Sequence, residues 1–355
     1  MNGLDRRTVL WASAAVLAAG ASRSAAGDFD AVLGKTHASL AAAMAAADGT
    51  RPFRVLIPRG EWREKVVVTR PNVQLVGEDR RGSVIAFDAA AGHLDGYGAP
   101  YGTRGCATLT VRAPGFVARN LTVANTFDYI GNLQKSENDP TRLKDPQGVA
   151  LMLDEGSDRA LIEDVELFGH QDTLFIDRGL SLFRRCRVQG SVDFVFGAGQ
   201  SVLQNCEIVS RFRPGKPRQG YVAAPSTPVA QPFGLVFCDC RLTKEAEVPP
   251  SSVVLGRPWR PARQFDDGRY GDPAAVGNAA FIRCWMDDHI SPDGWDEMGY
   301  TAKSGERVFL RPEDARLVEV DSRGPGTVAG ARRRVLTPDE AVRYSPENVL
   351  DGWRA

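Results

Sequence analysis

From residue 54 onward, short runs in which apolar and polar residues alternate are separated by glycine, asparagine and aspartate. Alternation with a period of two is typical of β-strands, because successive side chains point to opposite faces. The helical spacing of apolar residues is scarce before the C-terminal end, apart from an early segment at 40–47. The pattern predicts an all-β chain in which this segment forms a helix that caps one end of the sheets.

A short phrase recurs through the middle of the chain in one register, with an equivalent apolar position inside each copy. That position is occupied by Leu121, Val165, Cys186, Cys206, Cys240 and Cys284. The successive gaps are 44, 21, 20, 34 and 44 residues. We interpret each gap of 44 as two coils, the gaps of 21 and 20 as one coil each, and the gap of 34 as one coil with an insertion. A period of roughly 20 to 22 residues without intervening helices predicts one right-handed parallel β-helix. A leucine-rich repeat has a similar period, but its fixed leucine and asparagine positions are missing.

Stacked coils also bring cysteines together, since residues one coil apart lie about 4.8 Å from each other. Cys186 and Cys206 are one coil apart, and this separation is within the range that a disulfide tolerates. We therefore expect a Cys186–Cys206 disulfide in an oxidising compartment. The alternative is a ladder of reduced cysteines filling the interior. The remaining cysteines are expected to be core or surface thiols, namely Cys106, Cys238, Cys240 and Cys284.

The N-terminus has the features of an export signal. Arg6 and Arg7 precede an apolar run at 9–21 that is too short to span a bilayer, and small residues follow at 24–26. The paired arginines resemble a twin-arginine signal, which implies a bacterial source. We expect residues 1–26 to be the signal and 27–355 to be the β-helix domain with a C-terminal tail, exported to the periplasm or beyond the cell. A short N-terminal membrane anchor is the alternative.

The charges exclude some partners. Basic and acidic residues balance at 44 each, so no overall field attracts nucleic acid or an anionic membrane. We expect no nucleic-acid partner, no membrane contact once the signal is removed, and a monomeric chain.

Two aspartates are the candidates for chemistry. Asp172 and Asp193 are 21 residues apart, which places them on adjacent coils. Two carboxyl groups held so close cannot both ionise easily, so one takes a raised pKa and can donate a proton while the other remains an anion. Gln147 and Gln171 are also about one coil apart and offer amide donors for an oxyanion. The alternative is a polar ladder that only satisfies backbone groups.

Six motifs in order resemble those of the pectin methylesterase (pectinesterase) family, and the resemblance covers 40–295. The motifs are Gly-Glu-Trp-Arg-Glu-Lys from Gly60, Gly-Thr-Arg-Gly-Cys-Ala-Thr from Gly102, Gln-Gly-Val-Ala-Leu from Gln147, Gly-His-Gln-Asp-Thr-Leu from Gly169, Asp-Phe-Val-Phe-Gly from Asp193 and Leu-Gly-Arg-Pro-Trp from Leu255. Cys106 stands where a serine is usual in this family and His170 where an aromatic residue is often found. The resemblance implies removal of methyl esters from the galacturonate units of pectin, with methanol released.

The resemblance also implies roles for individual residues. Asp193 is the nucleophile and Asp172 the general acid and later the base. Gln147 and Gln171 line the oxyanion site, and Arg257 pairs with Asp193 and the sugar. Two aromatic residues, Trp259 and Phe196, offer apolar faces to the sugar, and Thr103 contacts the substrate. The substrate is methylated homogalacturonan, and neither a metal nor another cofactor is required.

Other classes of protein fit less well. A serine hydrolase lacks its Gly-x-Ser-x-Gly motif here, and the scattered histidines give no zinc-ligand spacing. A polysaccharide lyase or a glycosidase on the same solenoid remains an alternative, because two carboxylates can also cleave a glycosidic bond. A non-catalytic carbohydrate-binding β-helix and a family member acting on acyl thioesters are further alternatives.

Overall fold

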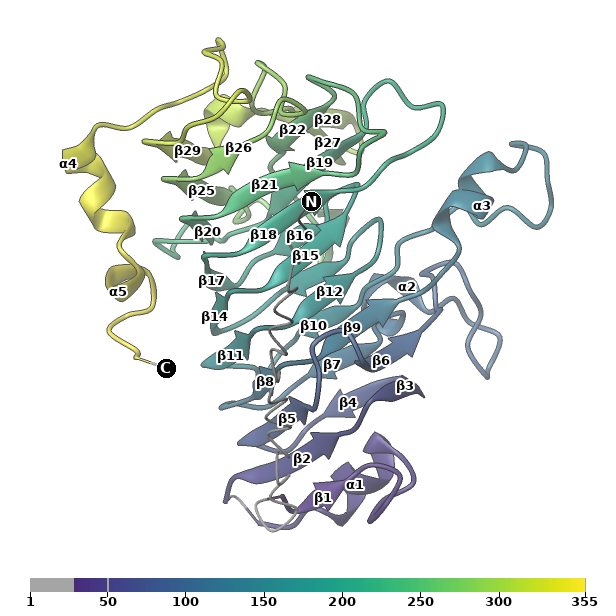
Figure 1. Ribbon diagram of the computed structural model, residues 1–355. Coiled ribbons are helices and arrows are strands. Elements are labelled where there is room, and N and C mark those ends of the chain that lie inside the picture. Colours follow the sequence, from purple (N-terminus) through teal and green to yellow (C-terminus); the bar gives the residue numbers. More distant parts are fainter. Residues whose placement is uncertain (1–28, 50, 355) are drawn as a thin grey trace, which may run out of the picture.

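The computed structural model describes residues 29–49 and 51–354. The predicted export signal at 1–26 lies outside these residues. Within them the chain is a right-handed parallel β-helix (Figure 1), as the repeat predicted. This handedness follows from the right-handed crossover that parallel strands favour. None of the helices in the described ranges is long and apolar enough to cross a membrane.

Three parallel sheets form the walls of the solenoid, and each coil contributes one strand to most of them. In spatial order, sheet 1 contains β1 (Ala31–Val32), β2 (Phe53–Ile57), β5 (Val73–Gly77), β8 (Val117–Arg119), β11 (Ala160–Glu163), β14 (Leu180–Arg184), β17 (Gln200–Gln204), β20 (Leu235–Cys238), β25 (Asn278–Ile282) and β29 (Arg316–Val320). Sheet 2 contains β3 (Gly60–Arg63), β6 (Ser83–Phe87), β9 (Thr122–Asn125), β12 (Glu166–Phe168), β15 (Arg187–Gly190), β18 (Glu207–Ser210), β21 (Arg241–Lys244) and β26 (Trp285–Met286). Sheet 3 contains β4 (Val66–Val68), β7 (Leu109–Val111), β10 (Leu151–Leu153), β13 (Leu174–Ile176), β16 (Val195–Gly197), β19 (Gly220–Pro225) and β22 (Val253–Gly256).

The remaining elements lie outside the walls. Two antiparallel hairpins are formed by β23 (Ala262–Phe265) with β24 (Gly268–Gly271) and by β27 (Met298–Thr301) with β28 (Arg307–Leu310). The α-helices are α1 (Leu40–Ala46), α2 (Gly102–Gly105), α3 (Tyr129–Gln134), α4 (Pro338–Ala341) and α5 (Pro346–Val349), and 3₁₀ turns occupy Pro312–Asp314 and Val342–Tyr344. Figure 1 shows α1 at one end of the stack, α3 projecting from one side, and α4 and α5 along another.

In-register stacking of apolar residues fills the interior. In sheet 3, Leu109 pairs with Leu151, Leu151 with Leu174, and Leu174 with Val195. All four side chains are at most 1% exposed. Burying one such side chain stabilises the fold by about 1.5–3 kcal/mol, so each coil depends on its neighbours for its core.

The predicted capping helix is confirmed as α1. Its N-terminus is held twice, because the Ser39 hydroxyl accepts from the Ala42 N–H and the Glu64 carboxylate accepts from the Leu40 N–H. Leu40 and Ala43 are buried against the first coils. The helix therefore covers the open end of the apolar interior.

The coil count in the repeat was wrong at its two longest gaps. Thr122 pairs directly with Glu166, and Arg241 pairs directly with Trp285, so each gap of 44 residues is one coil and not two. The extra residues leave the wall as insertions, which include α3 in the first case and the β23–β24 hairpin in the second. The spacing of the repeat alone cannot distinguish two coils from one coil with a long insertion.

The predicted Cys186–Cys206 disulfide was also wrong, because all six cysteines are free and buried. Equivalent side chains on successive coils point in the same direction, so stacking brings the backbones to disulfide distance without aiming the two sulfurs at each other. Cys186 Sγ instead donates to the Ile162 carbonyl at 3.3 Å, and Cys240 Sγ donates to the Leu203 carbonyl at 3.2 Å. The structure thus has the reduced ladder, and burial raises the pKa of the Cys186 thiol.

Candidate active site

The two aspartates lie on adjacent coils of sheet 3, as predicted. Asp172 comes just before β13 and Asp193 just before β16, and these strands pair with Leu174 opposite Val195. The Asp172 N–H donates to the Val192 carbonyl at 3.0 Å, which continues the ladder up to the carboxylates. Both residues turn the chain with a left-handed φ, of 65° and 49°, a conformation that aspartate tolerates better than most residues. Both are almost fully buried.

Arg257 binds Asp193 with both ends of its guanidinium. Nε lies 3.0 Å from Oδ1 and Nη2 lies 2.7 Å from Oδ2, which is the bidentate geometry that makes strong ion pairs. Burial acts to lower the pKa of Arg257, but the Asp193 carboxylate outweighs it and the pKa is raised. Arg257 follows β22, and its N–H donates to the Ala223 carbonyl on the neighbouring coil. The pair therefore fixes the orientation of the buried Asp193 carboxylate.

Asp172 has the opposite environment. Burial, followed by the nearby Asp193 carboxylate, raises its pKa well above the ordinary value, although Arg257 acts in the other direction. A carboxyl group with a raised pKa beside one that is paired with an arginine is an arrangement that suits a proton donor next to a nucleophile.

The two glutamines lie beside these carboxyl groups on neighbouring coils. The Gly148 N–H donates to the Gln171 carbonyl at 3.0 Å, which fixes Gln147 relative to Gln171. Gln147 Oε1 is buried and has no hydrogen-bond partner among the described residues. Buried polar atoms without partners are rare in folded proteins, and functional sites are one place where they occur.

An aromatic patch borders the carboxyl groups. Phe196 stacks on Phe175 with ring centroids 4.2 Å apart, and Trp259 packs edge-on against Phe196 at 5.7 Å. Phe196 is only 3% exposed, whereas Trp259 is partly exposed, so Trp259 is the better placed of the two predicted aromatic residues to meet a sugar.

Thr103 is brought to the glutamines by its turn. It lies in α2, and the Cys106 thiol donates to both the Thr103 carbonyl, at 3.3 Å, and the Gln147 carbonyl, at 3.5 Å. The cysteine that replaces the usual serine therefore connects a predicted substrate contact with a predicted oxyanion residue.

Sequence reasoning missed two aromatic residues of this site. Phe175 was detectable, because it lies one coil before Phe196 in the same register. Tyr221 was not, since an insertion precedes its strand and obscures the period. The Tyr221 ring faces the Arg257 guanidinium at 3.8 Å, on which it packs as a cation–π partner.

His170 packs as an aromatic ring among its neighbours. Its ring stacks on Tyr129 at 4.9 Å. Burial lowers its pKa to about 3, and Arg211 and Arg213 contribute to the shift. The imidazole is therefore neutral at ordinary pH, and it packs where an aromatic residue would.

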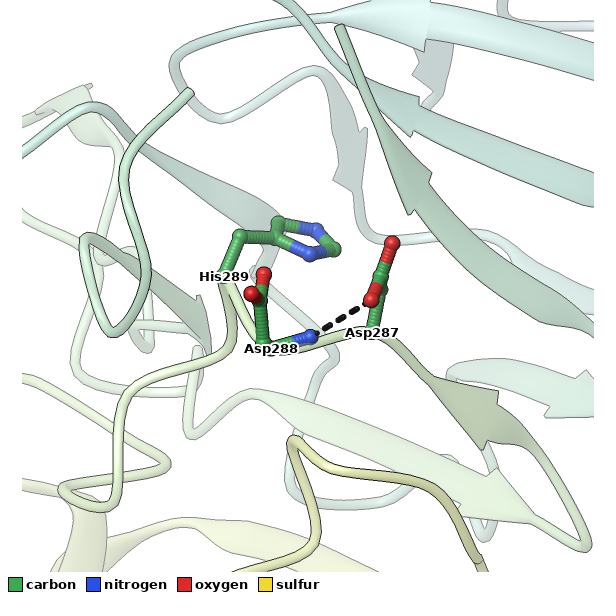
Figure 2. Close-up of side chains that lie close together, drawn as sticks. All are labelled: Asp287, Asp288 and His289. Atoms are coloured by element: carbon green, nitrogen blue, oxygen red, sulfur yellow. Dashed lines mark hydrogen bonds between the residues drawn. The ribbon is translucent and has the colours of Figure 1, made fainter. Parts of the chain in front are cut away.

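One cluster of metal-ligating side chains occurs in the described residues, away from the aspartate pair. Figure 2 shows that it consists of Asp287, Asp288 and His289, and their ligand atoms lie within 4.8 Å of one another. The Asp288 carboxylate already has a cation, because Lys244 Nζ lies 2.5 Å from it, and Asp287 accepts from the Asp288 N–H at 2.9 Å. His289 is fully buried, and burial lowers its pKa to about 4. The cluster is an ion-paired turn between sheets 2 and 3.

Comparison with known proteins agrees with this geometry. The sequence pattern of the family described as Pectinesterase matches residues 30–349. Pectinesterase A of Dickeya dadantii (strain 3937) is 42% identical over 325 residues, which cover 90% of this chain and 88% of that protein. A crystal structure of pectin methylesterase in complex with hexasaccharide VII matches with a TM-score of 0.89 at 42% identity, covering 92% of this chain and 98% of that one. Pectin methylesterase from Yersinia enterocolitica matches with a TM-score of 0.86 at 43% identity, covering 89% and 99%. The chain therefore belongs to the pectinesterase family of carboxylic ester hydrolases.

Proposed function

We propose that this chain hydrolyses the methyl esters of galacturonate units in homogalacturonan, releasing methanol and leaving carboxylates. The observation that carries the proposal is the pair of unlike carboxyl groups: Arg257 Nη2 lies 2.7 Å from Asp193 Oδ2, whereas burial and the neighbouring Asp193 raise the pKa of Asp172. Pectinesterase relatives at 42% identity support the substrate.

The reaction proceeds in two steps. An Asp193 oxygen attacks the ester carbonyl carbon, and the amides of Gln147 and Gln171 stabilise the oxyanion. The carbon–oxygen bond to the methoxy group then breaks while Asp172 gives its proton to the departing oxygen, so methanol leaves and an acyl anhydride remains on Asp193.

Hydrolysis of the anhydride restores the enzyme. Asp172, now an anion, takes a proton from water as the water oxygen attacks the acyl carbon, and the bond to Asp193 breaks. The product is a galacturonic acid group, which releases the remaining proton of the water to solvent and becomes a carboxylate, and Asp172 carries its proton again. Arg257 keeps Asp193 ionised and oriented between cycles, while Trp259, Phe196 and Thr103 bind the sugar.

The test compares methanol release and oligosaccharide binding for the wild type, Asp193→Asn, Asp172→Asn and the double variant. Each single variant should lose on the order of a thousandfold or more in kcat with binding nearly intact, and the double should be scarcely worse because the two groups act as a unit. Asp239→Asn is the matched control, because Asp239 also has a left-handed φ of 55° and a bidentate arginine partner, Arg283, but lies in the turn between sheets 1 and 2.

Other outcomes identify the alternatives. New chain ends without methanol would establish a lyase or a glycosidase, and parallel loss of binding and activity would establish carbohydrate binding by the carboxylates. Near-normal methanol release by Asp193→Asn would exclude the covalent mechanism.

We also propose that the mature chain is exported after loss of residues 1–26. N-terminal sequencing of protein from the periplasm and the culture medium would test this, and an intact Met1 would contradict it.

A further inference from the structure

Arg104, which directly follows Thr103, connects the α2 turn to sheet 3. Its Nη1 lies 2.5 Å from Asp154 Oδ1, and its Nη2 lies 2.7 Å from Asp177 Oδ2. The guanidinium also lies over the Phe175 ring, 5.2 Å from its centroid. The Arg104 side chain thus connects the α2 turn with the aromatic patch and with two coils of sheet 3.

The two carboxylates are fixed anchors. Asp154 follows β10 and Asp177 follows β13, and their side chains are 6% and 7% exposed. A buried carboxylate is costly without a charged partner, and Arg104 is the nearer cation for both, since Arg178 Nη1 lies 3.7 Å from Asp177 Oδ2. Arg112 pairs with Asp154 as well, with Nε 2.9 Å from Oδ2, but it follows β7 and so joins one coil to the next.

The α2 turn needs such support. It has four residues, begins and ends at glycine, and has no side-chain cap. A single helical turn is not stable by itself in water, because nucleation costs more than one hydrogen bond returns. On its other side the Lys65 ammonium donates to the Gly105 carbonyl. Cations from two directions therefore hold a turn that has little stability of its own.

We propose that Arg104 is a positioning residue for substrate binding, which clamps α2 onto β10 and β13 and thereby sets the place of Thr103. It acts through Thr103 and makes no contact with the sugar. The inference rests on the substrate-binding role proposed above for Thr103, and it assigns a function to an ion-pair cluster that the reaction itself does not use.

The first measurement is independent of catalysis. Hydrogen exchange of the unliganded protein should be faster at 102–106 in Arg104→Ala than in the wild type, while exchange within β10 and β13 is unchanged. Arg112→Ala is the matched control, because its side chain is 49% exposed against 50% for Arg104 and it loses a pairing with the same Asp154. Its exchange at 102–106 should equal that of the wild type.

The second measurement separates binding from chemistry. With methylated oligogalacturonate, Arg104→Ala should raise KM about tenfold, which corresponds to about 1.4 kcal/mol, and change kcat less than about twofold. If Arg104 acts through Thr103, then Thr103→Ala should raise KM similarly, and the double variant should be no worse than the more damaging single one. Arg112→Ala should leave both parameters unchanged.

Several results would overturn the clamp. Unchanged exchange at 102–106 in Arg104→Ala would do so, as would equal effects of Arg104→Ala and Arg112→Ala, since the cluster would then only stabilise the edge of the sheet. Additive effects of Thr103→Ala and Arg104→Ala on KM would also count against the clamp. If Arg104→Ala lost more affinity for demethylated than for methylated oligosaccharide, Arg104 would contact a substrate carboxylate directly. A wild type that released no methanol would instead refute the proposed function, and the exchange experiment would still test the clamp.

Discussion

The two aspartates differ in what surrounds them, although both come from the same chemical type on neighbouring coils. Asp193 has a guanidinium bound to both oxygens, whereas Asp172 has no salt-bridge partner within 29–49 and 51–354 and lies beside Asp193 in a buried site. The difference supports the unlike roles proposed for the two residues, and it also has consequences for stability.

The Asp172→Asn variant should be more stable than the wild type at neutral pH. The folded-state pKa of Asp172 is raised above its ordinary value of 3.8, so its contribution to folding is fully present below that pH and is lost as the pH rises through the folded pKa. Asparagine stays neutral throughout. The difference in Tm should therefore be near zero at about pH 4 and should grow as the pH rises. Calorimetry over a pH series checks this, and a difference that did not vary with pH would contradict it.

The Asp193→Asn variant should change stability in the other direction. It removes the carboxylate from Arg257, whose side chain is 23% exposed, and leaves a largely buried cation without its partner. Breaking a buried pair in this way costs about 3–5 kcal/mol, which partial exposure of the arginine reduces to about 1–3 kcal/mol. Urea denaturation of the two aspartate variants measures the contrast, and equal shifts for both would show that the environments do not differ.

Arg257→Lys should keep the charge and lose the geometry. A lysine ammonium cannot hold two carboxylate oxygens in a plane or pack flat on the Tyr221 ring. Loss of one charged hydrogen bond corresponds to about 1.5–3 kcal/mol, so kcat/KM should fall about 10- to 100-fold. Wild-type turnover of methylated pectin by this variant would mean that Arg257 is an ordinary ion pair.

At the scale of elements, the ladder of reduced cysteines predicts that adding a reductant does not change the stability of the protein. Four stacked thiols each donate to a carbonyl of the preceding coil, namely those of Cys186, Cys206, Cys240 and Cys284. A disulfide closing a loop of 20 residues would contribute about 3 kcal/mol in the chain-entropy model. We therefore expect the same Tm with and without reductant, and six titratable thiols after unfolding of protein never exposed to reductant. A lower Tm in reductant together with four thiols would contradict the free ladder.

At the scale of the whole molecule, the C-terminal segment seals the outer face of sheet 1. Tyr344, Val349 and Leu350 are buried against Val202 and other outward residues of this sheet, and Gln200 Nε2 donates to the Val349 carbonyl at 2.6 Å. The segment thus covers apolar surface of sheet 1 that would otherwise face water, whereas the aspartates belong to sheet 3.

Removal of residues 337–355 should lower stability without altering the chemistry. Three large side chains leave the core, which corresponds to about 3–6 kcal/mol after allowing for compact unfolded states. We expect a lower urea midpoint and binding of a hydrophobic dye, with kcat and KM per folded molecule unchanged. Val342→Ser is the control, since Val342 is 68% exposed and should have no effect. A truncated protein with the wild-type midpoint would show that the segment only rests on the surface.

The sequence by itself determined the solenoid, its capping helix and the neighbouring positions of Asp172 and Asp193. The reason is that a β-helix repeats locally, so residues one period apart are neighbours whatever the rest of the chain does. The same local rule found the stacked phrase residues and would have found Phe175.

Only the tertiary structure decided the contacts and coil lengths that the repeat period does not specify. The gaps of 44 residues became single coils because their extra residues leave the wall, and stacked cysteines stayed reduced because equivalent side chains point the same way. The Tyr221 ring on Arg257 and the Arg104 ion pairs join residues separated by 36 to 73 positions with no fixed period. The Arg257–Asp193 pair follows no period either, and it was predicted from the family resemblance alone. Such contacts depend on where insertions return to the solenoid and on which buried charges then find partners, and both are properties of the folded chain as a whole.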